Sequence, residues 1–285
     1  MPYGRILAAL SVVLFATVAQ AQSPTQPIHF HLVHGFVILA QGEIGGLDHL
    51  NILIDTGAVP SALSRRVAAQ LGARGPSSDL SLPSGRIHAQ YATVKDVRLN
   101  WAHKESLDMV ILDLAAFEER LGTRIDAILG LDLFANDNFS IDYRDATIRP
   151  GLSGSSHHQA PAEILYVGAA PYWVLSVQCD GATTQVLLDT GADDVTLFAN
   201  AVAHITRRGG QSQDNLFASA SINPASSATG QFILGDAIFA KQRHTVIPKP
   251  TGALGELDGL LGPTALHIRR LEFDWQHRLL WWDDK

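Results

Sequence analysis

The 285-residue sequence contains one cysteine, Cys179, so an intramolecular disulfide scaffold is excluded. The residues around Cys179 have the pattern of a strand, which favours a small packed side chain over a reactive nucleophile. Histidine and cysteine nowhere cluster with the spacing of a zinc site. The fold is therefore expected to depend on its apolar core alone.

Charge is also scarce, at 17% of residues, and the formal net charge is −7. The basic residues are scattered rather than gathered into a stripe, so nucleic acid is not expected as a partner. Aromatic residues are sparse until the end of the chain, where Trp275, Trp281 and Trp282 crowd the last predicted strand. We expect these tryptophans to pack in the core or between two halves of the molecule.

Long hydrophobic runs are missing except at the start of the sequence. Residues 6–18 are apolar, follow Arg5 and precede Ala-Gln-Ala at 19–21, which fits the small-x-small rule of signal-peptide cleavage. The run is short for a membrane span, although an uncut anchor is the alternative. We expect residues 1–21 to be an export signal. After its removal we expect no stable membrane span, and we expect the protein to be periplasmic or secreted.

The rest of the sequence contains one pattern twice. Asn-Ile-Leu-Ile-Asp-Thr-Gly-Ala at 51–58 recurs as Gln-Val-Leu-Leu-Asp-Thr-Gly-Ala at 185–192, an offset of 134 positions. Asp-Ala-Ile-Leu-Gly at 126–130 recurs as Asp-Gly-Leu-Leu-Gly at 258–262, an offset of 132. Two matches in the same order at nearly the same offset indicate a tandem duplication.

The boundary between the copies is a segment rich in Pro, Gly and Ser, residues 149–162, which predicts a linker. The predicted lobes are residues 28–148 and 163–285. Short apolar, β-branched segments bounded by turn residues predict a mostly β fold with a few short helices. Predicted strands cover 29–42, 51–54, 164–179 and 185–188, and predicted helices cover 64–71, 113–121 and 198–208.

Each Asp-Thr-Gly triplet follows an apolar strand, so the loop that carries it should be held rigidly. Glycine permits tight backbone geometry and the close approach of another chain. The threonine hydroxyl can bond across to the opposite loop, or locally within its own turn. A pseudo-twofold axis would bring Asp55 and Asp189 together. The expected supporting residues are Thr56, Gly57, Thr190 and Gly191.

Two carboxyls in contact cannot both ionise cheaply, so Asp55 and Asp189 are expected to share one proton. Their titration then belongs to the pair. One carboxylate takes a proton from a bound water, while the other, protonated, donates to the carbonyl oxygen of an amide. This chemistry needs neither a metal nor another cofactor. The segments that end in Gly130 and Gly262 are expected to pack the loops from behind.

These motifs resemble those of pepsin-like and retropepsin-like aspartic peptidases. The resemblance rests on Ile-Asp-Thr-Gly-Ala at 54–58 with Ile-Leu-Gly at 128–130, and on Leu-Asp-Thr-Gly-Ala-Asp at 188–193 with Leu-Leu-Gly at 260–262. It implies a β-rich bilobed body, a catalytic pair of aspartates and a cleft between lobes for a peptide or protein substrate. Because one chain supplies both halves, a monomer is expected rather than an obligate homodimer.

The small lobes and the alanine after each triplet are more retropepsin-like than pepsin-like. Pepsin-like members often carry serine there, and its hydroxyl favours the ionised carboxylate. Ala58 and Ala192 cannot provide this hydrogen bond. We therefore expect a dyad pKa less depressed than in pepsin and a mildly acidic working pH, and an optimum near about pH 2 would contradict this.

The family covers its cleft with a hairpin, for which residues 80–94 are the candidate because Pro-Ser-Gly at 83–85 is a turn signal. Gly85 and Tyr91 are accordingly predicted to bind substrate. The counterpart hairpin is expected within 215–234, turning at Asn-Pro 223–224. The resemblance also implies that Asp193 bonds the substrate backbone, with a solvated loop acid as the alternative.

Other interpretations stay open. The same fold can serve as an inactive periplasmic peptide-binding or scaffold protein, in which the two triplet aspartates only cap loops. His29, His31 and His34 are a candidate metal set, but the third lies on the other strand face and no carboxylate is in register, so no metal is expected. Asp126 and Asp258 are expected to bond turns before a strand.

Overall fold

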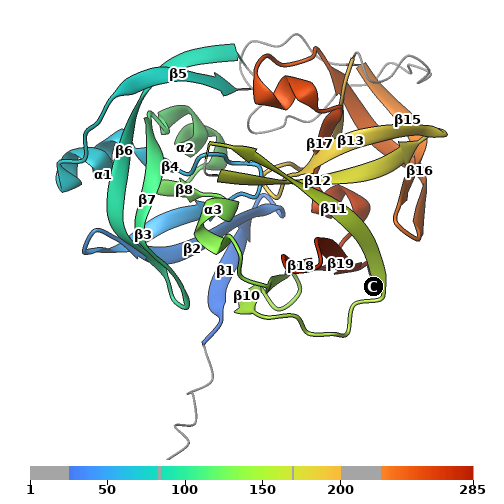
Figure 1. Ribbon diagram of the computed structural model, residues 1–285, viewed down its shortest axis with the longest axis horizontal. Coiled ribbons are helices and arrows are strands. Elements are labelled where there is room, and N and C mark those ends of the chain that lie inside the picture. The colour runs from blue at the N-terminus through green and yellow to red at the C-terminus, as the bar shows by residue number, and fades with distance from the viewer. Residues whose placement is uncertain (1–25, 83–84, 169, 200–225, 285) are drawn as a thin grey trace, which may run out of the picture.

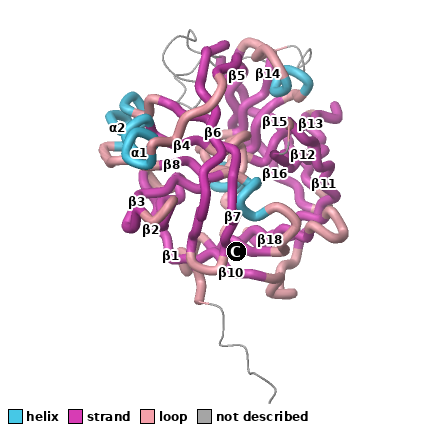
Figure 2. Tube along the Cα trace, turned by 60° about the vertical axis from the view of Figure 1, so that its left-hand side comes forward, coloured by secondary structure: helices cyan, strands magenta, loops and turns pink. Residues whose placement is uncertain are grey.

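The computed structural model describes residues 26–82, 85–168, 170–199 and 226–284 (Figure 1). Strands dominate this part of the chain and the helices are short (Figure 2). The predicted mostly β fold class is confirmed. In the same residues, no helix is long and apolar enough to cross a membrane. The helices are α1 (Arg65–Leu71), α2 (Ala115–Leu121) and α3 (Leu131–Phe134), with 3₁₀ turns η1 (Ala253–Glu256) and η2 (Pro263–Leu266).

The first half of the chain, blue to green on the left of Figure 1, builds one sheet from its first eight strands. Its strands β3 and β8 run parallel, which sets Ile54 beside Leu129. Strand β4 is parallel to β7 and antiparallel to β8. The strands are β1 (Ile28–Val33), β2 (Val37–Ile44), β3 (Leu47–Ile54), β4 (Ala62–Ser64), β5 (Ser77–Leu82), β6 (Gly85–Leu99), β7 (Ala102–Leu112) and β8 (Ala127–Leu129).

The second half, yellow to red on the right of Figure 1, repeats these pairings. Strands β13 and β17 run parallel with Leu188 beside Leu261, and β14 is parallel to β16 and antiparallel to β17. Each triplet therefore follows a central strand, β3 or β13. That strand pairs with the short hydrophobic strand that precedes a glycine, β8 or β17. The strands are β11 (His158–Val167), β12 (Ala170–Cys179), β13 (Ala182–Leu188), β14 (Val195–Phe198), β15 (Ser226–Leu234), β16 (Ala237–Ile247) and β17 (Gly259–Leu261).

A third, antiparallel sheet joins the two halves in the order β1, β10, β9, β18, β19, β11. At its centre β9 pairs with β18, so that Ile141 lies opposite Leu271. Because each half contributes three neighbouring strands, the halves are held by backbone hydrogen bonds as well as by packing. The additional strands are β9 (Phe139–Asp142), β10 (Thr147–Pro150), β18 (Arg270–Asp274) and β19 (Leu279–Asp283).

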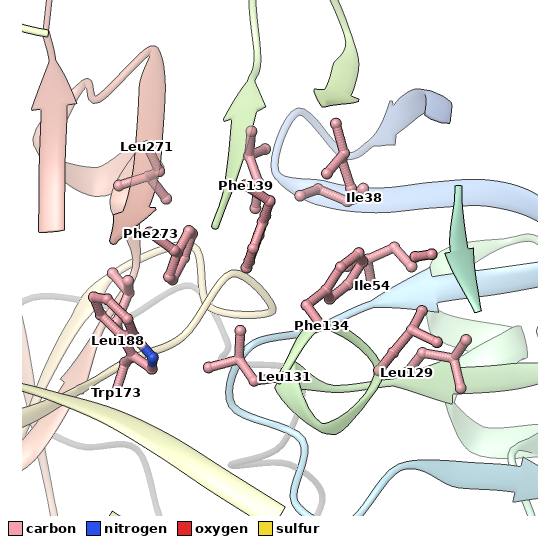
Figure 3. Close-up of a cluster of buried hydrophobic side chains, with 14 of the residues drawn as sticks. Ile38, Ile54, Leu129, Leu131, Phe134, Phe139, Trp173, Leu188, Leu271 and Phe273 are labelled. Atoms are coloured by element: carbon pink, nitrogen blue, oxygen red, sulfur yellow. The ribbon is translucent and has the colours of Figure 1, made fainter. Parts of the chain in front are cut away.

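A stack of buried aromatic rings crosses this junction (Figure 3). Phe134 stacks on Phe139 at 4.7 Å between ring centroids, and Phe139 stacks on Phe273 at 4.4 Å. Trp173 then meets Phe273 edge-on at 5.0 Å. All four rings are almost completely buried, and burial of each such ring contributes about 2–3 kcal/mol. Figure 3 shows the stack between the residues that precede the two triplets, so the core supports both loops.

Local sequence signals place the first two helices well. The Ser64 side chain accepts a hydrogen bond from the Val67 N–H at 3.2 Å, which caps α1, and Gly72 ends it in the left-handed conformation. Helix α2 lies inside the predicted 113–121, with the Asp113 carboxylate accepting from the Ala115 N–H. The predicted start of the helix at 198–208 is wrong, because Phe198 is the last residue of β14. Residues 200–208 lie outside the described part.

The predicted linker, residues 149–162, is shorter in the structure. Strand β10 extends to Pro150 and β11 begins at His158, so only the segment between them connects the halves. Residues 158–161 are extended because β19, at the far end of the sequence, pairs with them. His158 also stacks on the buried Trp282 at 5.6 Å, although its neighbours show no hydrophobic period.

Candidate active site

Both triplet loops are anchored to the strands behind them. The Asp55 N–H donates to the Leu129 carbonyl at 2.9 Å, and the Asp189 N–H donates to the Leu261 carbonyl at 3.0 Å. Gly130, which follows β8, also lies very close to the first loop, since a Cβ on this glycine would overlap the Ala58 carbonyl oxygen. The hydrophobic segments therefore pack directly behind the triplets.

The two threonines bond each loop to the other. The Thr56 N–H donates to Thr190 Oγ1 at 3.0 Å, and the Thr190 N–H donates to Thr56 Oγ1 at 3.0 Å. The hydroxyls donate onward to the opposite strands, Thr56 to the Leu188 carbonyl at 2.7 Å and Thr190 to the Ile54 carbonyl at 3.3 Å. All these groups are buried. The hydroxyls thus act across the loops instead of within their own turns.

The two glycines let the carboxyls converge. A Cβ on Gly57 would lie 2.7 Å from the Asp189 carboxyl carbon, and a Cβ on Gly191 would lie 2.7 Å from Asp55 Oδ2. Each carboxylate also accepts from the glycine N–H of its own triplet, at 2.8 Å for Asp55 and 2.9 Å for Asp189. Each carboxyl is consequently fixed by its own loop and lies directly against the glycine of the opposite loop.

The electrostatics of this pair favour a bound proton. Asp55 is fully buried and Asp189 is 4% exposed. Burial raises the pKa of Asp55, against the lowering effect of its hydrogen bonds to Asp189 and to backbone N–H groups. Burial, and then the charge and hydrogen bond of Asp55, raise the pKa of Asp189 well above its usual range. With both groups ionised, Asp55 Oδ2 accepts no hydrogen bond from the described residues, and a proton shared with Asp189 supplies one.

Two adjoining cavities have walls from both halves of the chain, and Asp189, but not Asp55, lines one of them. The smaller one, hereafter the chamber, has a volume of about 50 Å³ and includes Asp189 and Gly57 in its wall. The larger one, hereafter the groove, has a volume of about 630 Å³. The residues that line both cavities are Val59, Pro60, Leu80, Tyr172 and Leu254. A substrate segment in the groove can therefore continue towards the carboxyls.

Residues 40–133 match a family model described as aspartyl protease. This segment contains the first triplet and the hydrophobic segment that ends in Gly130. No curated protein matches the chain. The match supports an aspartic peptidase family and a protease-type hydrolase, and it agrees with the aspartate at the end of β3.

The segment that matches the family model, residues 40–133, includes the candidate flap. Strands β5 and β6 pair as an antiparallel hairpin in which Gly85 lies opposite Leu82, while the turn residues 83–84 are outside the described part. Tyr91 lines the groove but not the chamber, and burial followed by the charge of Asp79 raises its pKa. The turn predicted at 223–224 in the second half also lies outside the described residues.

The acids after the second triplet have separate environments. Asp193 is half-buried and does not line the chamber or the groove. Asp194 is buried and accepts hydrogen bonds from the Thr245 hydroxyl and, at 2.8 Å, from the Val195 N–H. Burial raises its pKa despite these bonds. Asp193 therefore lines neither cavity, and its predicted hydrogen bond to the substrate backbone stays a prediction.

Sequence reasoning missed two polar residues near the triplet loops. Asp132 is buried beside the first loop, where it accepts from the Ser61 hydroxyl and from the Ser61 N–H at 2.9 Å. The same hydroxyl accepts from the Gly130 N–H at 2.9 Å, so the pair ties the loop to the segment behind it. Tyr172, the second, lines the chamber, and the sequence gives no signal for it, since only the strand registers put it at the position equivalent to Val37.

Asp126 and Asp258 hold the strands that lead into the triplets. Asp126 accepts from the Asn51 N–H at 2.9 Å, and Asp258 accepts from the Gln185 N–H at 2.8 Å. Arg66 and Arg124 also bond the Asp126 carboxylate, each at 2.9 Å. Burial raises the pKa of Asp126, but these hydrogen bonds together outweigh it, and the pKa lies below its usual value.

This lowered pKa predicts a pH-dependent cost for Asp126→Asn. A carboxyl with a depressed folded pKa contributes stability that is complete above its unfolded pKa and is lost as pH falls through the folded value. The Tm gap between parent and variant should therefore be widest near neutral pH and close as pH falls below about 4. Asp137→Asn, at an exposed position, is the control. A gap that stays constant down to about pH 2 would refute the assignment.

Proposed function

We propose that the protein is an aspartic endopeptidase in which Asp55 and Asp189 activate a water molecule for attack on a peptide bond. The observation that carries the proposal is the convergence of two buried carboxyls, each lying against the glycine of the opposite triplet. The family match to residues 40–133 and the cavities beside Asp189 support it. No metal or other cofactor has a part in this chemistry.

The reaction follows from one proton shared by the pair. The ionised carboxyl takes a proton from water as the water oxygen bonds to the carbon of the scissile amide. The protonated carboxyl donates to the carbonyl oxygen, which gives a neutral tetrahedral intermediate. When the carbon–nitrogen bond breaks, the proton taken from water passes to the leaving nitrogen. The proton that was donated to the carbonyl oxygen returns from that oxygen to the carboxylate that gave it. The pair ends as it began.

Substrate is proposed to be an extended peptide that lies along the groove and enters the chamber. The chamber wall is mostly apolar, so we expect a small aliphatic side chain beside the scissile bond. Backbone of the hairpin formed by β5 and β6 can pair with such a peptide as an added strand. Sequencing the fragments of a denatured protein tests this preference.

The larger organisation is also part of the proposal. The repeated strand pairings favour two duplicated, retropepsin-like lobes, residues 28–148 and 163–285, in a monomer. Export through a signal at residues 1–21, to the periplasm or outside the cell, is proposed from the sequence alone, since those residues lie outside the described part.

The pH dependence of hydrolysis should reflect the pair. Neither Ala58 nor Ala192 provides a hydroxyl to favour ionisation, and burial raises both carboxyl pKa values. We expect a bell-shaped profile of kcat/KM with a mildly acidic maximum, because activity needs one proton on the pair. Hydrolysis of a denatured protein between about pH 2 and about pH 8 measures it. A maximum near about pH 2 would contradict the expectation.

A protein of this fold that binds peptides without cleaving them is the rival function. The same assay separates the two. Parent protein that binds a denatured substrate but yields no fragments at any pH would support the binding protein and end the endopeptidase proposal. Fragments released equally by the parent and by the Asp55→Asn and Asp189→Asn variants would point to a contaminating protease.

A further inference from the structure

Tyr172 supplies the chamber with a polar group that the aspartate chemistry does not use. Strand β12, which runs across the middle of the molecule in Figure 1, carries it. Among the described residues that line the chamber, Tyr172 and Asp189 are the only ones with a polar side chain. A tyrosine hydroxyl thus shares a small, otherwise apolar space with the carboxyl proposed to react.

The ring of Tyr172 is held firmly, which leaves the hydroxyl as its free end. The side chain is 6% exposed and packs in a cluster with Leu187, Leu254 and Leu260, with Val59 of the first half against it. Its hydroxyl makes no hydrogen bond within the described residues. It is also not one of the fully buried polar atoms there that lack a hydrogen-bond partner. The hydroxyl is therefore part of the small exposed fraction and opens to the cavities.

Burial, and then nearby charge, keep this hydroxyl protonated. Burial raises the pKa of Tyr172, and the charges of Asp189 and Asp55 raise it further. At every pH at which a protein works the group is then a neutral hydroxyl, able to donate one hydrogen bond and to accept others.

The hydroxyl makes the two halves of the site unequal. Strands β2 and β12 pair with the triplet strands in equivalent registers, which puts Val37 at the position of Tyr172. Val37 is fully buried and aliphatic. The second half therefore offers the chamber a hydroxyl that the first half lacks at the equivalent position, and this difference gives the bound chain a preferred direction.

We propose that Tyr172 is a substrate-binding residue whose hydroxyl donates a hydrogen bond to a main-chain carbonyl of the peptide next to the scissile bond. The inference rests on the proposed endopeptidase function. A peptide carbonyl that enters an apolar chamber loses its hydrogen bonds to water, and leaving it unpaired is costly. Tyr172 is the neutral side chain in the chamber wall that can replace them.

Tyr172→Phe tests the proposal because it removes the hydroxyl and keeps the packed ring. With a peptide substrate chosen from the cleavage fragments, KM should rise about threefold to tenfold with kcat nearly unchanged, the pattern of a lost uniform binding contact. A peptide analogue with a secondary alcohol in place of the scissile amide should lose affinity by the same factor. Tyr166→Phe, at an exposed position that lines neither cavity, is the control and should leave KM within about twofold.

The outcomes separate this inference from the function on which it rests. If the parent cleaves peptides and Tyr172→Phe has the parent's KM and affinity for the alcohol analogue, the inference is wrong and the endopeptidase stands. If Tyr172→Phe lowers Tm by several degrees, the hydroxyl serves the fold and the inference is also wrong. A parent that cleaves nothing refutes the function itself.

Discussion

Replacing either Asp55 or Asp189 by Asn should lower kcat by about 10³- to 10⁴-fold. Asparagine has the shape of aspartate and can still accept the glycine N–H of its own triplet. It cannot take a proton from water or exchange one with its neighbour. The two losses should not add, because the pair acts as one unit and either substitution disables it.

The same variants should be at least as stable as the parent at neutral pH. A carboxyl whose folded pKa is raised holds its proton more tightly when folded, so stability falls as pH rises from the ordinary aspartate pKa through the raised value. Asparagine removes this penalty, and Tm near pH 7 should rise. Inactive variants with a lowered Tm would instead indicate that the aspartates are structural.

Thr56→Val should destabilise the protein by about 2–6 kcal/mol. Valine has nearly the volume of threonine but cannot donate to the Leu188 carbonyl or accept from the Thr190 N–H. Two buried backbone groups on the opposite loop are then unpaired, at about 1–3 kcal/mol each. Because these bonds also hold the loops together, activity should fall with stability.

Urea denaturation followed by tryptophan fluorescence measures this loss. Thr56→Ser is the matched control, since serine keeps the hydroxyl and should cost less than about 1 kcal/mol. If valine and serine are tolerated equally, the hydrogen bonds between the loops do not stabilise the fold and the symmetric junction has another basis.

The sequence revealed those features that depend on neighbouring residues or on repetition. The triplets and the segments ending in Gly130 and Gly262 stand out because they occur twice, and their pairing requires a β3–β8 contact that the structure has. Helix α1 was predictable from Ser64 and Gly72, since a cap and a left-handed stop are local signals.

Features that depend on distant partners could not be read from the sequence. The segment that begins at His158 has the composition of a linker, and becomes a strand because β19 pairs with it. Asp132 looks like an ordinary helix-start acid until the fold brings Ser61 beside it. Tyr172 looks like one more aromatic residue of a buried strand, and only the packing of β12 against the triplets brings it to the chamber wall.

The most direct test of the shared proton is a ¹³C NMR titration of the aspartate carboxyls in the parent and in the Asp55→Asn and Asp189→Asn variants. The prediction is one carboxyl signal that stays protonated well above the ordinary aspartate pKa of about 3.9, is coupled to a second, and is absent from both variants. Two carboxyls that titrate independently near the ordinary value would contradict the account.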